Sequence, residues 1–93
     1  MADGYCGDIW ARVEASKTKA AETLRIARRG LYYKHADACY RDAYASEDYW
    51  SSYRQRLTRI VKRSRNSAEA LRTLKRTMKR WPADVIEAMG LAR

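Results

Sequence analysis

Residues that stop helices are scarce in this chain, and that scarcity restricts its fold more than any other feature. One proline and four glycines interrupt 93 residues, and no stretch alternates apolar and polar side chains over the length of a strand. Fifteen alanines, the strongest helix formers, are spread along the chain. The sequence therefore predicts an all-α fold: one helical domain over residues 1–93, a small bundle of about four helices that ends in a basic helical hairpin.

Aliphatic side chains are too few to form the core alone. Leu, Ile and Val together number thirteen and phenylalanine is absent, whereas ten residues are Tyr or Trp. Aromatic rings bury large areas per residue, so we expect an aromatic core. Tyr33, Tyr40 and Tyr44 recur at helical spacing and are expected to place rings in it. Trp50 and Tyr53 share one helical face and are expected there as well.

Three signals divide the first two thirds of the chain into helices. A polar stretch at residues 16–19 interrupts the first apolar stripe and predicts a break. Gly30 follows two arginines, and we favour a break or kink there over a helix that continues past it. Ser46 precedes two acidic residues and predicts the N-cap of the best-defined helix, residues 47–64.

The last third of the chain contains stronger signals for helix ends. A three-residue turn is expected to follow that helix, with Asn66 or Ser67 as the N-cap of the next one. Pro82 is expected to end or bend this next helix and to be the first residue of a final short helix, residues 82–89. Gly90 is expected to terminate the final helix as its C′ residue.

The net charge of +9 lies entirely in the C-terminal half. Residues 1–50 hold eight Lys/Arg and eight Asp/Glu, whereas residues 51–93 hold twelve and three. Such a density maintains a positive field that attracts polyanions, and its excess of arginine favours phosphate, which a guanidinium binds through paired hydrogen bonds. The candidate residues for binding nucleic acid or an acidic partner are Arg54, Arg56, Arg59, Lys62, Arg63, Arg65, Arg72, Lys75, Arg76, Lys79 and Arg80.

These cations fall on defined helical faces. Arg56, Arg59 and Arg63 are three and four residues apart and form a row beside the apolar stripe of their helix. On the following helix the cations cover the side away from Leu71 and Leu74, so two consecutive helices each present a basic face. A solvated surface is the alternative interpretation, and a helix-turn-helix reader of the DNA major groove is another.

Three aromatic residues are further candidates for contacts with bases or with a protein. Tyr32 and Tyr49 lie off the predicted apolar stripes, and Trp50 is next to Tyr49. Exposed rings can stack on unpaired bases, as in proteins that bind single strands.

The chain offers little material for a metal site or for catalysis. His35 and Cys39 are four residues apart and would share a helix face, with Cys6 or Asp42 as a third ligand. Zinc sites recruit four ligands at defined spacings, so we expect a packed Cys39 beside a surface His35, with no metal and no cofactor. The chain has one histidine and no glycine-rich phosphate loop, so no pair of nucleophile and base can be identified. No catalytic residue is therefore assigned, and no enzymatic activity is expected.

Together these features predict a small non-enzymatic protein that grips the phosphate backbone of DNA or RNA. The alternative is an inhibitor or adaptor of the kind that phages and mobile elements encode against defence systems, which would bind an acidic protein surface or a nucleoprotein complex. Two cysteines are too few for a secreted disulfide framework, and the N-terminus lacks the order of a signal peptide. We expect a cytoplasmic regulatory protein without membrane contact, and a homodimer is left open.

Overall fold

Helices are the only regular elements in residues 2–91, the part of the chain that the computed structural model describes, with side chains described from Ile9 onward. This confirms the all-α prediction. The elements follow one another as α1 (Ala2–Ala15), α2 (Lys19–Tyr40), α3 (Tyr44–Arg63), α4 (Ser67–Thr77), the 3-10 helix η1 (Met78–Arg80) and α5 (Ala83–Ala88).

The predicted break in the first apolar stripe separates α1 from α2. Thr18 is the N-cap of α2, and its hydroxyl accepts a hydrogen bond from the backbone N–H of Ala21 at 3.2 Å. At the end of α1, the Arg25 guanidinium donates to the carbonyl oxygens of Val13 and Ser16, both at 2.7 Å. The polar stretch therefore ends one helix and begins the next because side chains satisfy the free backbone groups at both ends.

Asn66 and Gly90 mark helix ends after α3 as predicted, but Pro82 does not end α4, because α4 ends at Thr77 and the 3-10 helix η1 follows it. Asn66 is the N-cap of α4, and its side-chain oxygen accepts from the backbone N–H of Glu69 at 2.9 Å. Pro82 is the N-cap of α5, one residue before the position predicted for it. Gly90 follows α5 with a φ of +75°, the left-handed conformation expected of a terminating glycine.

The prediction of a break at Gly30 is wrong, because α2 runs through this residue without interruption. Gly30 instead lies where the backbone of α5 approaches α2. A Cβ atom at this position would overlap the carbonyl oxygen of Ala88. The glycine is needed for a close approach between two helices, not for a turn.

The prediction of Ser46 as an N-cap is also wrong. Helix α3 begins at Tyr44, so Ser46 lies in its first turn. The reversal between α2 and α3 falls at residues 41–43, where Asp42 adopts a φ of +55° and the backbone N–H of Ala43 donates to the carbonyl of Ala38 at 3.0 Å. An aspartate tolerates this left-handed conformation better than most residues, and so it closes α2 without glycine.

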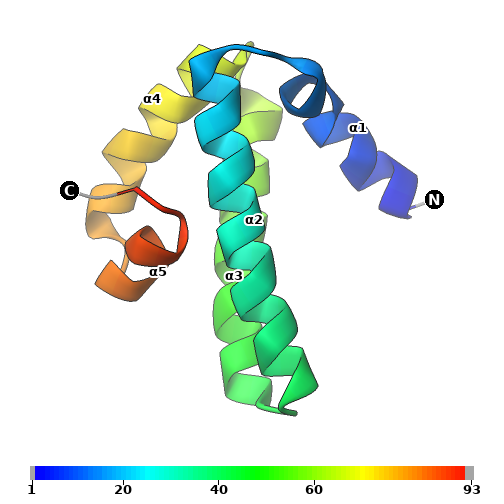
Figure 1. Ribbon diagram of the computed structural model, residues 1–93, viewed down its shortest axis with the longest axis vertical. Helices are drawn as coiled ribbons and strands as arrows, with labels where there is room; N and C mark the ends of the chain where they lie inside the picture. The colour runs from blue at the N-terminus through cyan, green and yellow to red at the C-terminus, as the bar shows by residue number, and fades with distance from the viewer. Residues whose placement is uncertain (1, 92–93) are drawn as a thin grey trace.

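A long hairpin of α2 and α3 organises the molecule (Figure 1). Helix α1 lies on one side of the upper half of this hairpin, and α4 and α5 lie on the other side (Figure 1). Helix α5 lies beside the middle of the hairpin, and the lower end, which holds the turn between α2 and α3, projects beyond these helices (Figure 1). The molecule measures 36 × 35 × 19 Å, and its least dimension is about two helix diameters. A structure only two helices thick leaves each helix with an exposed face.

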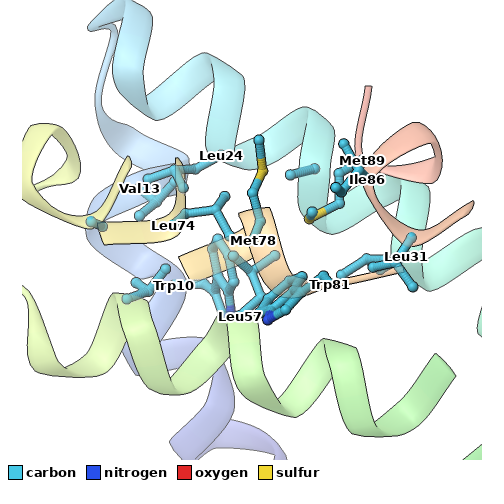
Figure 2. Close-up of a cluster of buried hydrophobic side chains, with 14 of the residues drawn as sticks. Trp10, Val13, Leu24, Leu31, Leu57, Leu74, Met78, Trp81, Ile86 and Met89 are labelled. Atoms are coloured by element: carbon cyan, nitrogen blue, oxygen red, sulfur yellow. The ribbon is translucent and has the colours of Figure 1, made fainter. Parts of the chain in front are cut away.

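Most of the core lies in the upper half of the α2–α3 hairpin, and Ala38 and Trp50 extend it toward the lower end. Figure 2 shows Leu74 of α4 and Met78 of η1 between Leu24 of α2 and Leu57 of α3. Met89, which caps the C-terminus of α5, is completely buried against the same cluster. All five α-helices contribute to this single core, which also holds the following buried residues: Trp10, Val13, Ala21, Ala27, Leu31, Ala38, Trp50, Val61, Ala70, Trp81, Val85 and Ile86.

The expected aromatic core is formed by tryptophans and not by tyrosines. The three tryptophans are buried, whereas Tyr33, Tyr40 and Tyr44 are 62%, 91% and 72% exposed, contrary to their predicted place in the core. These tyrosines belong to the projecting half of the hairpin, where no third helix covers them (Figure 1). Tyr53 packs against the edge of the core, with its ring centroid 5.2 Å from that of Trp81.

Candidate nucleic-acid interface

Helix α3 supplies one wall of the candidate interface. Trp50, Leu57 and Val61 are buried on one side of this helix, and their spacing of seven and four residues defines its inner face. The predicted row of Arg56, Arg59 and Arg63 is displaced from that face and is exposed. Burial of the apolar stripe therefore orients these arginines toward solvent on the side of α3 that adjoins α4.

Helix α4 supplies the other wall, and the turn before it determines its start. The Glu69 carboxylate accepts a hydrogen bond from the backbone N–H of Arg65 at 2.7 Å, while Asn66 caps the helix. Ala70 and Leu74 face the core. The five predicted cations of this segment are exposed on the remaining faces of α4 and η1: Arg72, Lys75, Arg76, Lys79 and Arg80.

An open groove of about 390 Å³ lies between the two walls. We call it the basic groove and define it by its lining residues: Arg56, Arg59, Ile60, Arg63, Ser64, Glu69, Thr73, Thr77 and Trp81. Arginines thus line its α3 side, and threonine hydroxyls line its α4 side. Arg76 is three residues beyond Thr73 and lies on the same side of α4, so further positive charge borders the groove.

Glu69 is the single acidic residue in the lining of the basic groove, and it is already engaged. The hydrogen bond from the backbone of Arg65 lowers the pKa of Glu69. Partial burial raises this pKa, whereas the nearby positive charges of Arg65 and Arg72 lower it further. The Arg65 guanidinium also lies 3.7 Å from this carboxylate. Glu69 is therefore ionised at neutral pH, and Arg65 balances its charge.

Most of the predicted cations on α3, α4 and η1 form no salt bridge with a described side chain. Within residues 9–91, whose side chains the structure describes, eight predicted residues form neither a salt bridge nor a hydrogen bond through their side chains: Arg56, Arg59, Arg63, Arg72, Lys75, Arg76, Lys79 and Arg80. Of these, Arg56 lies over the ring of Tyr53, 4.8 Å from its centre. Like charges this close repel one another, and Glu69 is the single acid in the lining of the groove that can offset them. An external anion would relieve this repulsion.

Three predicted cations are separated from that group. The guanidinium of half-buried Arg54 donates to His35 Nδ1 at 2.8 Å and lies 5.1 Å from the centre of the Tyr32 ring. Lys62 lines a second cavity of about 420 Å³, which lies on the other side of α3, beside α1 and α2. Arg65 pairs with Glu69, as described above. Arg59 lines both the second cavity and the basic groove, so the predicted basic surface extends over both flanks of α3.

The aromatic candidates are placed less favourably than the cations. Trp50 is only 9% exposed and belongs to the core, so its ring offers no free face for stacking. Tyr49 is half-buried, and its hydroxyl donates to Asp84 Oδ1 at 2.8 Å, which links α3 to α5. Burial and this hydrogen bond raise the pKa of Tyr49 to about 12. Tyr32 is half exposed, and Arg54 covers part of its ring.

Sequence reasoning missed the structural use of some cations. Arg12 donates to the carbonyl oxygens of Arg65 at 2.7 Å and of Ser64 at 3.3 Å, just beyond the C-terminus of α3. A cation is favourable at this negative end of a helix dipole. No local pattern marks Arg12 for this role, because its partners are more than fifty residues away.

The residues weighed as metal ligands lie at the projecting end of the hairpin. Cys39 is exposed and not packed, contrary to the prediction, while His35 is half-buried. Glu47, which was not considered, replaces Asp42 as their neighbour: one ligand atom of each of His35, Cys39 and Glu47 lies within 4.8 Å of the others. The side chain of Cys6 lies outside the described residues.

Comparison with known proteins returned no relative. No protein-family model, curated protein or solved structure matches the chain significantly. None of the helices in the described range combines the length and the apolar character needed to cross a membrane. A functional assignment therefore depends on the site alone.

Proposed function

We propose that this protein binds the phosphate backbone of nucleic acid through a basic C-terminal hairpin, formed by α3, α4 and η1. One observation carries the proposal: eight exposed cations on α3, α4 and η1 have neither a salt bridge nor a side-chain hydrogen bond among the described side chains, and three of them line a groove whose single acid is already paired with Arg65. Ordinary protein surfaces intersperse both signs of charge. Phosphates would supply the missing anions, and arginine binds them through two parallel hydrogen bonds.

The distribution of the cations favours backbone contact over base reading. They extend along both helices and into η1, and the start of α4 carries Asn66, Ser67 and Glu69 instead of a cluster of basic residues. A helix-turn-helix protein reads bases mainly with the N-terminal residues of its second helix. Phosphate contacts position a protein on nucleic acid but carry no sequence information, so we expect low sequence specificity.

The test is a titration against duplex DNA, single-stranded DNA and structured RNA at several salt concentrations. If roughly four to six phosphates are neutralised, the logarithm of affinity for duplex DNA falls with the logarithm of salt at a slope of about −4 to −5. Replacing Arg72, Arg76 and Lys79 by glutamine should make the slope shallower by about 3.

A control variant separates the proposed surface from net charge. Lys17, Lys19 and Arg29 are exposed and lie outside the C-terminal hairpin, so their replacement by glutamine removes the same charge elsewhere. This control should retain the steep slope. Equal weakening of both variants, or binding that is insensitive to salt, would refute the proposed hairpin interface.

A second candidate function is supported by the exposed tyrosines. Tyr33, Tyr40 and Tyr44 lie on the projecting half of the hairpin, away from the basic groove, and tyrosine is enriched in protein interfaces. An inhibitor or adaptor would use this surface together with its cations on an acidic protein or a nucleoprotein complex. In that case Tyr40→Ser with Tyr44→Ser abolishes capture of the partner and leaves binding to free nucleic acid unchanged.

A further inference from the structure

We propose that His35, Cys39 and Glu47 form a binding site for a divalent zinc ion near the projecting end of the α2–α3 hairpin. The proposal is independent of nucleic-acid binding. It rests on the convergence of three different ligand types: an imidazole nitrogen, a thiol sulfur and a carboxylate oxygen within 4.8 Å of one another. Imidazole and thiolate together suit zinc, whereas calcium and magnesium prefer oxygen ligands alone.

Both arms of the hairpin build this site. His35 and Cys39 are four residues apart in the last turns of α2, so their side chains share one face. Asp42 in its left-handed conformation helps to reverse the chain, and α3 then returns beside α2 with Glu47 in its first turn. The site is therefore local in sequence, but the third ligand is placed by the turn and by helix packing.

The spacing of the ligand atoms is compatible with a zinc ion. Zinc binds sulfur at about 2.3 Å and nitrogen or oxygen at about 2.0–2.2 Å, so its tetrahedral ligands lie roughly 3.3–3.7 Å from each other. Side-chain rotation of exposed Cys39 and half-buried His35 can shorten 4.8 Å to that range without moving the helices. The fourth position is open to solvent and would be filled by water, and the Cys39 proton leaves to solvent when the zinc–sulfur bond forms.

Arg54 controls access to this site. Its guanidinium can only donate, so at 2.8 Å from His35 Nδ1 it occupies the lone pair of a neutral ring. A zinc ion bound at Nδ1 takes the place of this hydrogen bond, and the positive charge of Arg54 opposes the approach of zinc to either ring nitrogen. The guanidinium already lies 5.1 Å from the centre of the Tyr32 ring, where it can remain once displaced. Removing Arg54 should therefore strengthen zinc binding.

The first experiment uses cobalt(II) as a spectroscopic probe for the zinc site. Reduced full-length protein carrying Cys6→Ser, which removes the second thiol, is titrated with Co²⁺ in the absence of nucleic acid. We expect a thiolate-to-cobalt charge-transfer band and the visible bands of a tetrahedral ion, both abolished by added Zn²⁺. Adding Cys39→Ser should eliminate the charge-transfer band.

Further variants identify the other ligands. His35→Gln and Glu47→Gln should each weaken Co²⁺ binding about tenfold or more, while Arg54→Gln should strengthen it. Asp42→Asn is the matched control, because it removes a nearby carboxylate and keeps a side chain suited to positive φ, so affinity should not change. Circular dichroism spectra verify that each variant is folded.

Two results would overturn the proposal. One is the absence of the charge-transfer band in folded Cys6→Ser protein, or its persistence after Cys39→Ser. The other is a folded His35→Gln variant whose affinity for Co²⁺ is unchanged, since the imidazole would then not be a ligand.

Discussion

A glycine in a helical protein can end a helix or can allow a second helix to approach closely. The first use was predicted for Gly30, and the structure shows the second. The missing side chain of glycine weakens a helix, so a glycine after two arginines suggests a helix end. In this fold the same feature allows α5 to pack its backbone against α2, at a distance that excludes even a methyl group. The local sequence is the same for both uses, and only the position of Ala88 distinguishes them.

Gly30→Ala tests this close approach, because its expected effect on the free energy of unfolding is opposite in sign to that of an ordinary glycine-to-alanine change in a helix. In an open helix interior, glycine to alanine raises the free energy of unfolding by roughly 0.5–1 kcal/mol. At Gly30 the added methyl group must separate α5 from α2, so we expect the free energy of unfolding to fall by about 1–3 kcal/mol. Urea unfolding followed by circular dichroism measures the change.

The reverse substitution at an exposed position is the control for helix propensity. Ala36→Gly on α2 should lower the free energy of unfolding by about 0.5–1 kcal/mol through propensity alone. If Gly30→Ala were stabilising, the close approach of α5 to α2 would be disproved.

At the level of the elements, helix ends depend on whether a capping side chain meets a free backbone N–H. Asn66 does so at the start of α4, at 2.9 Å from the backbone nitrogen of Glu69. Serine is as suitable for capping as asparagine, and Ser46 is also followed by acidic residues, yet it lies inside the first turn of α3. The difference arises because Asp42 closes α2 early, so that α3 begins before Ser46 is reached.

These two residues form a matched pair for mutation. Asn66→Ala removes an N-cap and should lower the free energy of unfolding by about 1 kcal/mol. Ser46→Ala should leave it unchanged or raise it by up to about 0.5 kcal/mol, since alanine is the better helix former. Thermal and urea unfolding of both variants measures the two effects. A loss at Ser46 as large as that at Asn66 would contradict the observed start of α3.

At the level of the whole molecule, α3 separates two kinds of surface. Its first half belongs to the projecting end of the hairpin with the exposed tyrosines, and its second half forms a wall of the basic groove. The core occupies the half of the hairpin that bears the cations. Their mutual repulsion therefore opposes the compact state of the fold.

This arrangement predicts that sodium chloride stabilises the free protein. Salt screens exposed charges over about 10 Å at 0.1 M, so raising sodium chloride from about 0.02 to 0.5 M should raise Tm. The increase should be smaller in the Arg72, Arg76 and Lys79 glutamine variant, because fewer neighbouring cations remain to be screened. The Lys17, Lys19 and Arg29 glutamine variant should respond like the parent protein. A Tm that does not depend on salt would contradict the prediction that repulsion between the exposed cations destabilises the fold.

The sequence alone determined the features that depend on near neighbours along the chain. Scarce helix breakers determine the helical class, and the polar stretch before α2, Asn66 and Gly90 mark helix ends through groups within a few residues. The spacing of Arg56, Arg59 and Arg63 places them on one side of a helix wherever that helix packs. These properties are set by backbone geometry and local hydrogen bonds.

The tertiary structure decided which faces are covered and which distant groups meet. Helical periodicity shows that Tyr33 and Tyr40 share a face, but burial requires another helix beside them, and in this fold none reaches the projecting end. Likewise, Glu47 joins His35 and Cys39 only because a left-handed residue places the return of the chain there. Burial and convergence depend on how helices pack against one another, and a linear pattern does not contain that arrangement.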